Sequence, residues 1–238
     1  MSTDLPFVSF AVPTYGRYPH RTHLLEEVIY WFNVQTYRRD RLELVLLNDA
    51  PEQKLLCHVP GVVVVNLDYR VPTLGGKRNM IQDLARGDII IPWDDDDISL
   101  PGRATNAVRN LRNHPYWDPR ARWFEQGGVL HHNHAQNCTQ HASAWRRSSG
   151  LRYREVTRGE DTWFANDASY LTPIHEPIPP AEWDYVYRWG VSDIHNSAQA
   201  DPAMTYAARK VEPGEFLIEP RMRRNYAADC LAIAKQVS

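Results

Sequence analysis

The sequence predicts an α/β fold in which a mainly parallel central sheet is flanked by helices. Three observations support this prediction. Short β-rich runs recur along roughly the first hundred residues, helical patterns separate them, and glycine or proline turns follow them. Strands that alternate with helices form parallel sheets, because each crossover returns the chain to the same end of the sheet. Ligands of such sheets gather at the carboxyl ends of the strands.

The first half of the chain carries the most regular pattern. It predicts, in order, a strand over 7–12, a helix over 20–35, strands over 42–49 and 61–67, a helix over 75–87 and a strand over 88–93. A glycine turn at Gly75 and Gly76 is expected to open the second helix, and Gly87 to close it. Polar stretches follow three of the strands, in PTYGR, NDAP and DDDD, so all three should face one crevice.

The second half is less regular. Segments 123–136 and 138–147 predict strands joined by loops, and 182–190 predicts another strand. Segment 159–168 predicts a helix with acidic residues at its positive N-terminal end. From about residue 200 we expect an irregular extension that ends in a short amphipathic segment.

Composition narrows the functional classes. The 238 residues suit one large domain, and the formal net charge of −2 gives no sign of general polyanion binding. The apolar runs are too short to span a bilayer, and the N-terminus lacks a signal-peptide pattern. The three cysteines lack metal-finger spacing and are expected to be reduced thiols. We therefore expect a cytoplasmic protein without a transmembrane segment.

Four consecutive aspartates, Asp94 to Asp97, follow the strand predicted over 88–93. Adjacent carboxylates repel one another and resist desolvation, so something must offset their charge beside a buried strand. Two carboxylates one residue apart can converge on a hard divalent cation. The alternative is a solvated acidic loop that caps a following helix, but the position after a buried strand favours metal binding.

Five stretches together resemble inverting family 2 glycosyltransferases with the GT-A fold: FAVPTYGR, LELVLLNDAP, GGKRNM, GDIIIPWDDDDISLPGR and GEDTWF. Their order and spacing match over roughly residues 7–170. The resemblance implies one GT-A domain over residues 1–238, with a nucleotide-sugar-binding half at 1–100, an acceptor-binding half at 101–200 and a C-terminal extension at 201–238. It also implies metal-dependent transfer of a sugar from a nucleotide diphosphate sugar, with a UDP-sugar as the expected donor.

The resemblance assigns metal and donor roles around the acidic run. It implies that Asp94 lies near the ribose or the metal, that Asp95 belongs to the donor-binding loop, and that Asp96 coordinates Mn²⁺ or Mg²⁺. Which carboxylate binds directly stays open, because the middle position is itself an aspartate. His195 would be a third metal or diphosphate contact and Arg188 another phosphate partner, although a loop histidine can simply be solvated.

The stretch VPTYGR resembles the first nucleotide loop of the family. The resemblance implies that Pro13, Thr14 and Tyr15 approach the uracil, with Tyr15 stacking on it, and that Arg17 meets phosphate. The alternative is a simple turn that ends a strand.

Two further stretches imply donor contacts. Asp49 keeps the second acid of a family pair that binds the base, so it is the candidate for reading uracil, although Asn48 and Ala50 depart from that pattern. Lys77 and Arg78 would offer cations to the donor diphosphate. A turn former at Asp49 and a basic helix surface at Lys77 and Arg78 are the alternatives.

The stretch GEDTWF resembles the Glu-Asp motif that holds the catalytic base of the family. An inverting transfer needs a carboxylate that takes the proton of the acceptor hydroxyl. The resemblance implies that Asp161 is this base and that Glu160 supports it or binds the acceptor. Ordinary acidic charge at a helix N-terminus is the alternative. Trp145, in a preceding segment, is either a sugar platform or part of the core.

Two other functions compete with sugar transfer. A nucleotidyltransferase that makes a nucleotide sugar would need a glycine-rich basic loop after the first strand, whereas PTYGR holds one glycine. A noncatalytic module that binds calcium and carbohydrate would not need the Glu-Asp motif. The expected acceptor is a hydroxyl group on a glycan, a small molecule, a protein or a modified nucleic-acid base.

Overall fold

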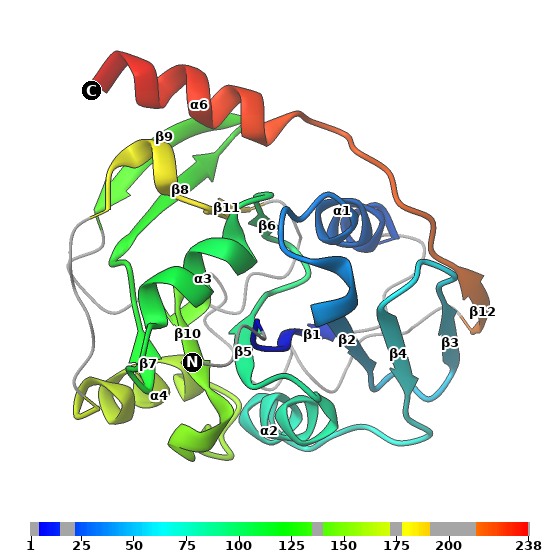
Figure 1. The fold of residues 1–238 in the computed structure, drawn as a ribbon. Helices are drawn as coiled ribbons and strands as arrows, with labels where there is room; N and C mark the ends of the chain where they lie inside the picture. Colours follow the sequence, from blue (N-terminus) through cyan, green and yellow to red (C-terminus); the bar gives the residue numbers. More distant parts are fainter. Residues whose placement is uncertain (1–4, 15–21, 135–139, 172–177, 191–212, 238) are drawn as a thin grey trace.

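The computed structural model describes residues 5–14, 22–134, 140–171, 178–190 and 213–237 (Figure 1). Its central sheet has the strand order β4-β2-β1-β5-β10-β7. These strands are β1 (Val8–Thr14), β2 (Leu42–Asn48), β4 (Val62–Asn66), β5 (Ile89–Pro92), β7 (Tyr116–Trp117) and β10 (Ala144–Arg146). The first four in spatial order run parallel, whereas β10 is antiparallel to both β5 and β7. The sheet is therefore mainly parallel, as predicted.

Helices cover both faces of this sheet, with α1 on one face and α2 on the other (Figure 1). The helices are α1 (Thr22–Asn33), α2 (Leu74–Leu84), α3 (Arg103–Leu111), α4 (Glu160–Ser169) and α6 (Tyr226–Val237). Short 3₁₀ turns lie at η1 (Arg39–Arg41), η2 (Gln140–Ala142), η3 (Arg147–Ser149) and η4 (Pro180–Glu182). Successive side chains of a strand point to opposite faces, so β5 sends Ile89 and Ile91 into one apolar cluster and Ile90 into the other.

A smaller sheet occupies much of the second half of the chain, in the strand order β6-β11-β8-β9. Its strands are β6 (Ile98–Ser99), β8 (Ala121–Gln126), β9 (Val129–His134) and β11 (Tyr185–Trp189). Gly127 and Gly128 join β8 to β9 with φ values of 58° and 81°, a backbone region that glycine enters without steric cost. β6 comes directly after the acidic run, so this sheet is tied to the end of β5.

The C-terminal segment departs from the irregular extension that we expected. β12 (Gly214–Leu217) pairs in parallel with β3 (Gln53–Leu56), and the chain then runs along the outer edge of the molecule to α6 (Figure 1). Tyr226, Cys230 and Ala234 of α6 join the main apolar core. The segment is therefore held at both ends by pairing or packing.

The predicted glycine turn before α2 is wrong. Gly75 and Gly76 lie inside the first turn of the helix, and Thr73 is the N-cap, whose hydroxyl oxygen accepts a hydrogen bond from the Gly76 amide at 3.1 Å. The helix also ends at Leu84, before the predicted Gly87. A Cβ on Gly87 would lie 2.6 Å from the amide nitrogen of Ser9, so this glycine allows close packing against β1.

Gly75 brings α2 against the segment that leads into α4. A Cβ on Gly75 would lie 1.9 Å from the carbonyl oxygen of Arg154, and the Gly75 amide donates to the Val156 carbonyl at 3.1 Å. One turn further along α2, the Asn79 side chain donates to the Tyr153 carbonyl at 2.9 Å and accepts from the Tyr153 amide at 2.8 Å. These contacts place the N-terminus of α4 relative to α2.

We expect the substitution Gly75→Ala to destabilise the protein by roughly 1–3 kcal/mol, because the added methyl group meets backbone that cannot move aside cheaply. Urea unfolding would measure the change. Gly76→Ala is the matched control, since its Cβ would meet only side-chain atoms, the nearest being the Thr73 hydroxyl at 3.0 Å. Equal stability of the two variants would contradict the close approach.

Candidate active site

The four aspartates after β5 divide into two kinds by burial. Asp95 and Asp97 are buried, whereas Asp94 and Asp96 are half-buried. The hydroxyl of Thr14, at the end of β1, donates to Asp95 Oδ2 at 2.7 Å. The alternation assigns Asp95 to the interior of the loop and leaves Asp94 and Asp96 on its accessible side.

Asp97 anchors the loop to the smaller sheet. Its carboxylate accepts hydrogen bonds from the Tyr185 hydroxyl at 2.5 Å and from the Arg188 amide at 2.8 Å. Burial, together with the charges of Asp96 and Asp94, raises the pKa of Asp97 to about 8. A proton on Asp97 near neutral pH would relieve part of the repulsion within the run.

Arg188, on β11, contacts the same loop from the protein interior. It is buried, its Nε donates to the Asp96 carbonyl, and its Nη1 donates to Glu27 Oε2 at 2.7 Å. The guanidinium expected as a phosphate partner therefore faces the interior, where it joins the acidic run to α1.

Lys77 forms a buried ion pair at the carboxyl ends of β1 and β2. Its side chain is 1% exposed, and its Nζ donates to Asp49 Oδ1 at 2.6 Å and to the Thr14 carbonyl. Asp49 Oδ2 also accepts a hydrogen bond from the Val71 amide at 3.2 Å. Burial lowers the pKa of Lys77, although the neighbouring Asp49 carboxylate opposes this shift.

Asn48, which departs from the family pattern, has a structural partner on the next strand. Its Nδ2 donates to Asn66 Oδ1 and to the Gln53 carbonyl, each at 3.0 Å, and its Oδ1 accepts from the Ala50 amide at 3.2 Å. An aspartate at this position could not donate these bonds when ionised. The departure therefore has a role in joining β2 to β4.

Arg78 links the acidic run to the N-terminus of α4. Its Nη2 donates to Asp94 Oδ1 at 2.7 Å, and its Nε lies 3.5 Å from Glu160 Oε1. The guanidinium carbon lies 5.6 Å from the centre of the Tyr153 ring. Burial disfavours this cation, but Asp94, Tyr153 and Glu160 more than compensate and keep the pKa of Arg78 high.

His141, in η2, makes a second link between the acidic run and α4. Its Nδ1 lies 3.0 Å from Asp94 Oδ2, its Nε2 lies 3.5 Å from Asp161 Oδ2, and its side chain is 13% exposed. Burial alone would lower the pKa of His141, but the charge of Asp94 and the contacts with both carboxylates raise it to about 10. The imidazole therefore lies between two carboxylates, which favour its protonated form.

The two acids of α4 experience opposite environments. Burial raises the pKa of Glu160, and the positive charge of Arg78 only partly offsets it. Burial acts on Asp161 in the same direction, but His141 and Arg78 outweigh it and lower the pKa of Asp161 to about 2. The Asp161 side chain is 38% exposed, so its ionised carboxylate is accessible.

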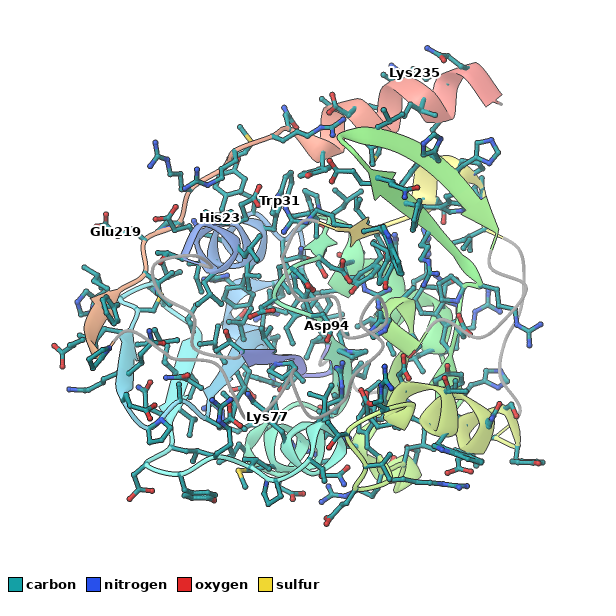
Figure 2. All side chains as sticks on the ribbon, turned by 180° about the vertical axis from the view of Figure 1, so that it is seen from behind. His23, Trp31, Lys77, Asp94, Glu219 and Lys235 are labelled. Atoms are coloured by element: carbon teal, nitrogen blue, oxygen red, sulfur yellow. The ribbon has the colours of Figure 1, made fainter. Side chains whose placement is uncertain are left out.

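The structure brings together residues that lie far apart in the sequence. Figure 2 shows Asp94 near the centre of the molecule, with Lys77 on α2 to one side. The predicted residues Arg78, Asp94, Glu160 and Asp161 form one connected group with His141. Beside that group, Thr14 joins Asp95 to the Lys77–Asp49 pair.

Other predicted residues lie at the edge of this group or outside the described part of the chain. Pro13 lines a cavity of about 10 Å³ next to Arg78. Trp145 is 1% exposed and packs in the core, so the core alternative holds. Tyr15, Arg17 and His195 fall outside the described residues.

His141 was not among the predicted site residues. The histidine stands in a stretch without a local metal or catalytic spacing, and only the antiparallel strand β10 that follows it returns the chain to β5. Sequence reasoning had one usable signal, namely that 141–147 precedes the Glu-Asp motif on the expected acceptor side.

The acidic run offers the type of ligand that a hard divalent cation takes, with both oxygens of Asp94 already in contact with Arg78 and His141. Asp94 and Asp96 supply half-buried carboxylate oxygens, the ligand type that Mn²⁺ and Mg²⁺ take in proteins. Among the described residues, no group of three or more His, Cys, Asp or Glu side chains is arranged to hold a metal. Any metal site here would therefore need ligands beyond these two carboxylates.

A family comparison agrees with this arrangement. The model of Glycosyl transferase family 2 matches residues 9–168, which is more than half of the chain and includes the described groups from Thr14 to Asp161. The chain belongs to glycosyl transferase family 2. The predicted family is thus confirmed. No curated protein matches this family 2 chain significantly by sequence.

Solved structures confirm the GT-A fold class of this family 2 chain. TarS from S. aureus in complex with UDP-GlcNAc is 14% identical, with a TM-score of 0.59, and the match covers 82% of this chain and 62% of that one. A mannosyltransferase from Pyrobaculum calidifontis in complex with GDP-Man and Mn²⁺ is 18% identical, with a TM-score of 0.54 and coverages of 78% and 57%. This chain thus spans about three fifths of the length of these structures. Within its described residues, no helix is long and apolar enough to cross a membrane.

We expect Lys77→Met to destabilise this family 2 chain by about 3–5 kcal/mol, because it leaves the buried Asp49 carboxylate without its main cation. Thermal and urea unfolding would measure the loss. The double variant Lys77→Met with Asp49→Asn should recover part of it, since the uncompensated charge is then gone. If the stability of Lys77→Met were unchanged, Lys77 would instead have a role only in ligand binding.

Proposed function

We propose that the chain is an inverting, divalent-metal-dependent glycosyltransferase that moves a sugar from a nucleotide diphosphate sugar to an acceptor hydroxyl. A UDP-sugar is the expected donor. The observation that carries this proposal is the group that joins Asp94, at the end of β5, to Asp161, at the start of α4, through His141. A donor-side carboxylate and an accessible, ionised carboxylate thus face the same imidazole from two parts of the chain.

On the donor side, Asp94 and Asp96 would hold Mn²⁺ or Mg²⁺, with His195 as a further ligand from outside the described residues. A divalent cation bound there would offset the negative charge that develops on the leaving diphosphate. Arg78, which already pairs with Asp94, adds positive charge beside this position. The hydrogen bond from the Thr14 hydroxyl to Asp95 joins the end of β1 to the acidic run beside this position.

On the acceptor side, Asp161 would take the proton of the attacking hydroxyl. The hydroxyl oxygen forms a bond to the anomeric carbon while the bond from that carbon to the diphosphate oxygen breaks, and the proton passes to the carboxylate. A single displacement of this kind inverts the anomeric centre and needs no covalent enzyme intermediate. The lowered pKa of Asp161 keeps it ionised at neutral pH, as a proton acceptor requires.

The proposal includes the division of the chain into a donor half over 1–100 and an acceptor half over 101–200. Arg78 and Asp94 come from the first of these, and His141 and Asp161 from the second, which supports the division. The nucleotide sugars bound to the two similar structures, one with UDP and the other with GDP and Mn²⁺, support the donor class and the metal. A cytoplasmic location stays a prediction.

A donor screen by thermal shift, with and without Mn²⁺, tests the donor class. We expect a UDP-sugar to raise the Tm only when Mn²⁺ is present, because ligand binding to the folded state stabilises it by mass action. Asp96→Ala should abolish this increase, since it removes a proposed metal ligand. If no nucleotide sugar stabilises the protein in a metal-dependent way, the proposal fails.

Asp161→Asn tests the base. We expect it to keep the donor-induced Tm increase while turnover falls by about 10²–10⁴-fold, because an amide cannot accept the proton. Release of UDP without pyrophosphate would measure turnover and exclude a nucleotidyltransferase. Asp167→Asn is the matched control on the same helix, where this residue pairs with Arg154 at the surface. Equal turnover of the two variants would assign the base elsewhere.

A further inference from the structure

His141 occupies an unusual position, with each ring nitrogen against a different carboxylate. Nδ1 lies 3.0 Å from Asp94 and Nε2 lies 3.5 Å from Asp161. The other oxygen of Asp161 accepts a hydrogen bond from the Thr162 amide at 2.7 Å. The Asp161 carboxylate is therefore held from two sides, by its own helix and by His141.

The surroundings of His141 fix its ring. The Tyr187 ring stacks on the imidazole at a centroid distance of 6.1 Å and an interplanar angle of 24°. Tyr187 is itself held, because Phe124 stacks on it at 5.9 Å and the Arg122 guanidinium carbon lies 4.6 Å from its ring centre. A ring held by such packing is oriented before any ligand binds.

The backbone of η2 is anchored as well. The buried Arg103 donates from Nη2 to the carbonyls of His141, at 3.3 Å, and Ser143, at 2.7 Å. Its Nη1 pairs with Asp184 at 3.0 Å. Both the main chain and the side chain of His141 are thus fixed, which is what a residue that orients another group requires.

We propose that His141 is a positioning residue that orients the Asp161 carboxylate for proton uptake and ties it to Asp94 on the donor side. This inference rests on the proposed function. His141 is not itself the proton acceptor, because both of its nitrogens already face carboxylate oxygens. Its action on the reaction passes through Asp161, whose geometry decides the rate of the proton transfer.

Two amide substitutions separate the two contacts. The amide of Asn reaches about as far as Nδ1 of histidine, so His141→Asn can keep a donor toward Asp94 and loses the one toward Asp161. The amide of Gln reaches about as far as Nε2, so His141→Gln keeps a donor toward Asp161 instead. If His141 were needed only for packing, loss of the contact with Asp161 would not by itself make the Asn variant less active than the Gln variant.

We expect His141→Asn to lower kcat by about 100-fold, with little change in the KM of the donor, and His141→Gln to retain about 10-fold more activity than His141→Asn. Steady-state kinetics with the donor identified by the thermal screen would measure both. His132→Gln, at an exposed residue of β9, is the matched control and should behave as wild type. Equal kcat in the Asn and Gln variants would overturn the proposal.

A second measurement does not depend on turnover. The variants His141→Phe, Asp161→Ala and the double variant form a cycle in Tm. Because the two side chains contact each other, the Tm change of the double variant should differ from the sum of the single changes. Additive changes would contradict the contact between His141 and Asp161 whether or not the protein transfers sugar. An inactive wild-type protein with a non-additive cycle would contradict the proposed function and leave that contact standing.

Discussion

Carboxylates crowded at the ends of parallel strands must be matched by cations, and the structure around this site depends on that constraint. Each of these groups comes from a different element of the fold than its partner. The pairs are Lys77 with Asp49, Arg78 with Asp94 and Glu160, His141 with Asp94 and Asp161, and Arg188 with Glu27 and the Asp96 carbonyl. Removing a carboxylate from water costs several kcal/mol unless an opposite charge accompanies it. The pairing therefore fixes the relative positions of α1, α2, η2 and α4.

Helix α2 contributes two of these cations, which point toward different parts of the site. Lys77 and Arg78 are neighbours in sequence, and about 100° separates neighbouring residues around a helix. One side chain can thus reach the ends of β1 and β2 while the other reaches β5 and α4. The close approach at Gly75 makes this possible, because it lets the helix contact the segment before α4 through backbone atoms.

The sequence predicted the features that local pattern encodes. Strands β1, β2, β4 and β5 are mainly apolar runs, and the acidic run follows β5. Helix α3 was not predicted because it is only nine residues long and its buried face includes a charged residue, Arg103, beside Ala104 and Ala107. The burial of Lys77 on α2 was not predicted either, since its partner Asp49 lies on another element, just after the end of β2. The position of His141 depends on the antiparallel pairing of β10 with β5, a long-range contact that residue spacing in the sequence does not predict.

The Glu-Asp pair of α4 illustrates how nearby cations can move the pKa values of two adjacent acids apart. Glu160 is buried beside Arg78 with a raised pKa, whereas Asp161 is half-exposed beside His141 with a lowered one. Environments that move neighbouring pKa values apart commonly divide acid and base roles in a site. An ionised and accessible carboxylate suits a proton acceptor, and a buried one suits a partner for a fixed guanidinium. These opposite environments favour Asp161 over Glu160 as the base, and His141 is the main cause of the lowered pKa of Asp161.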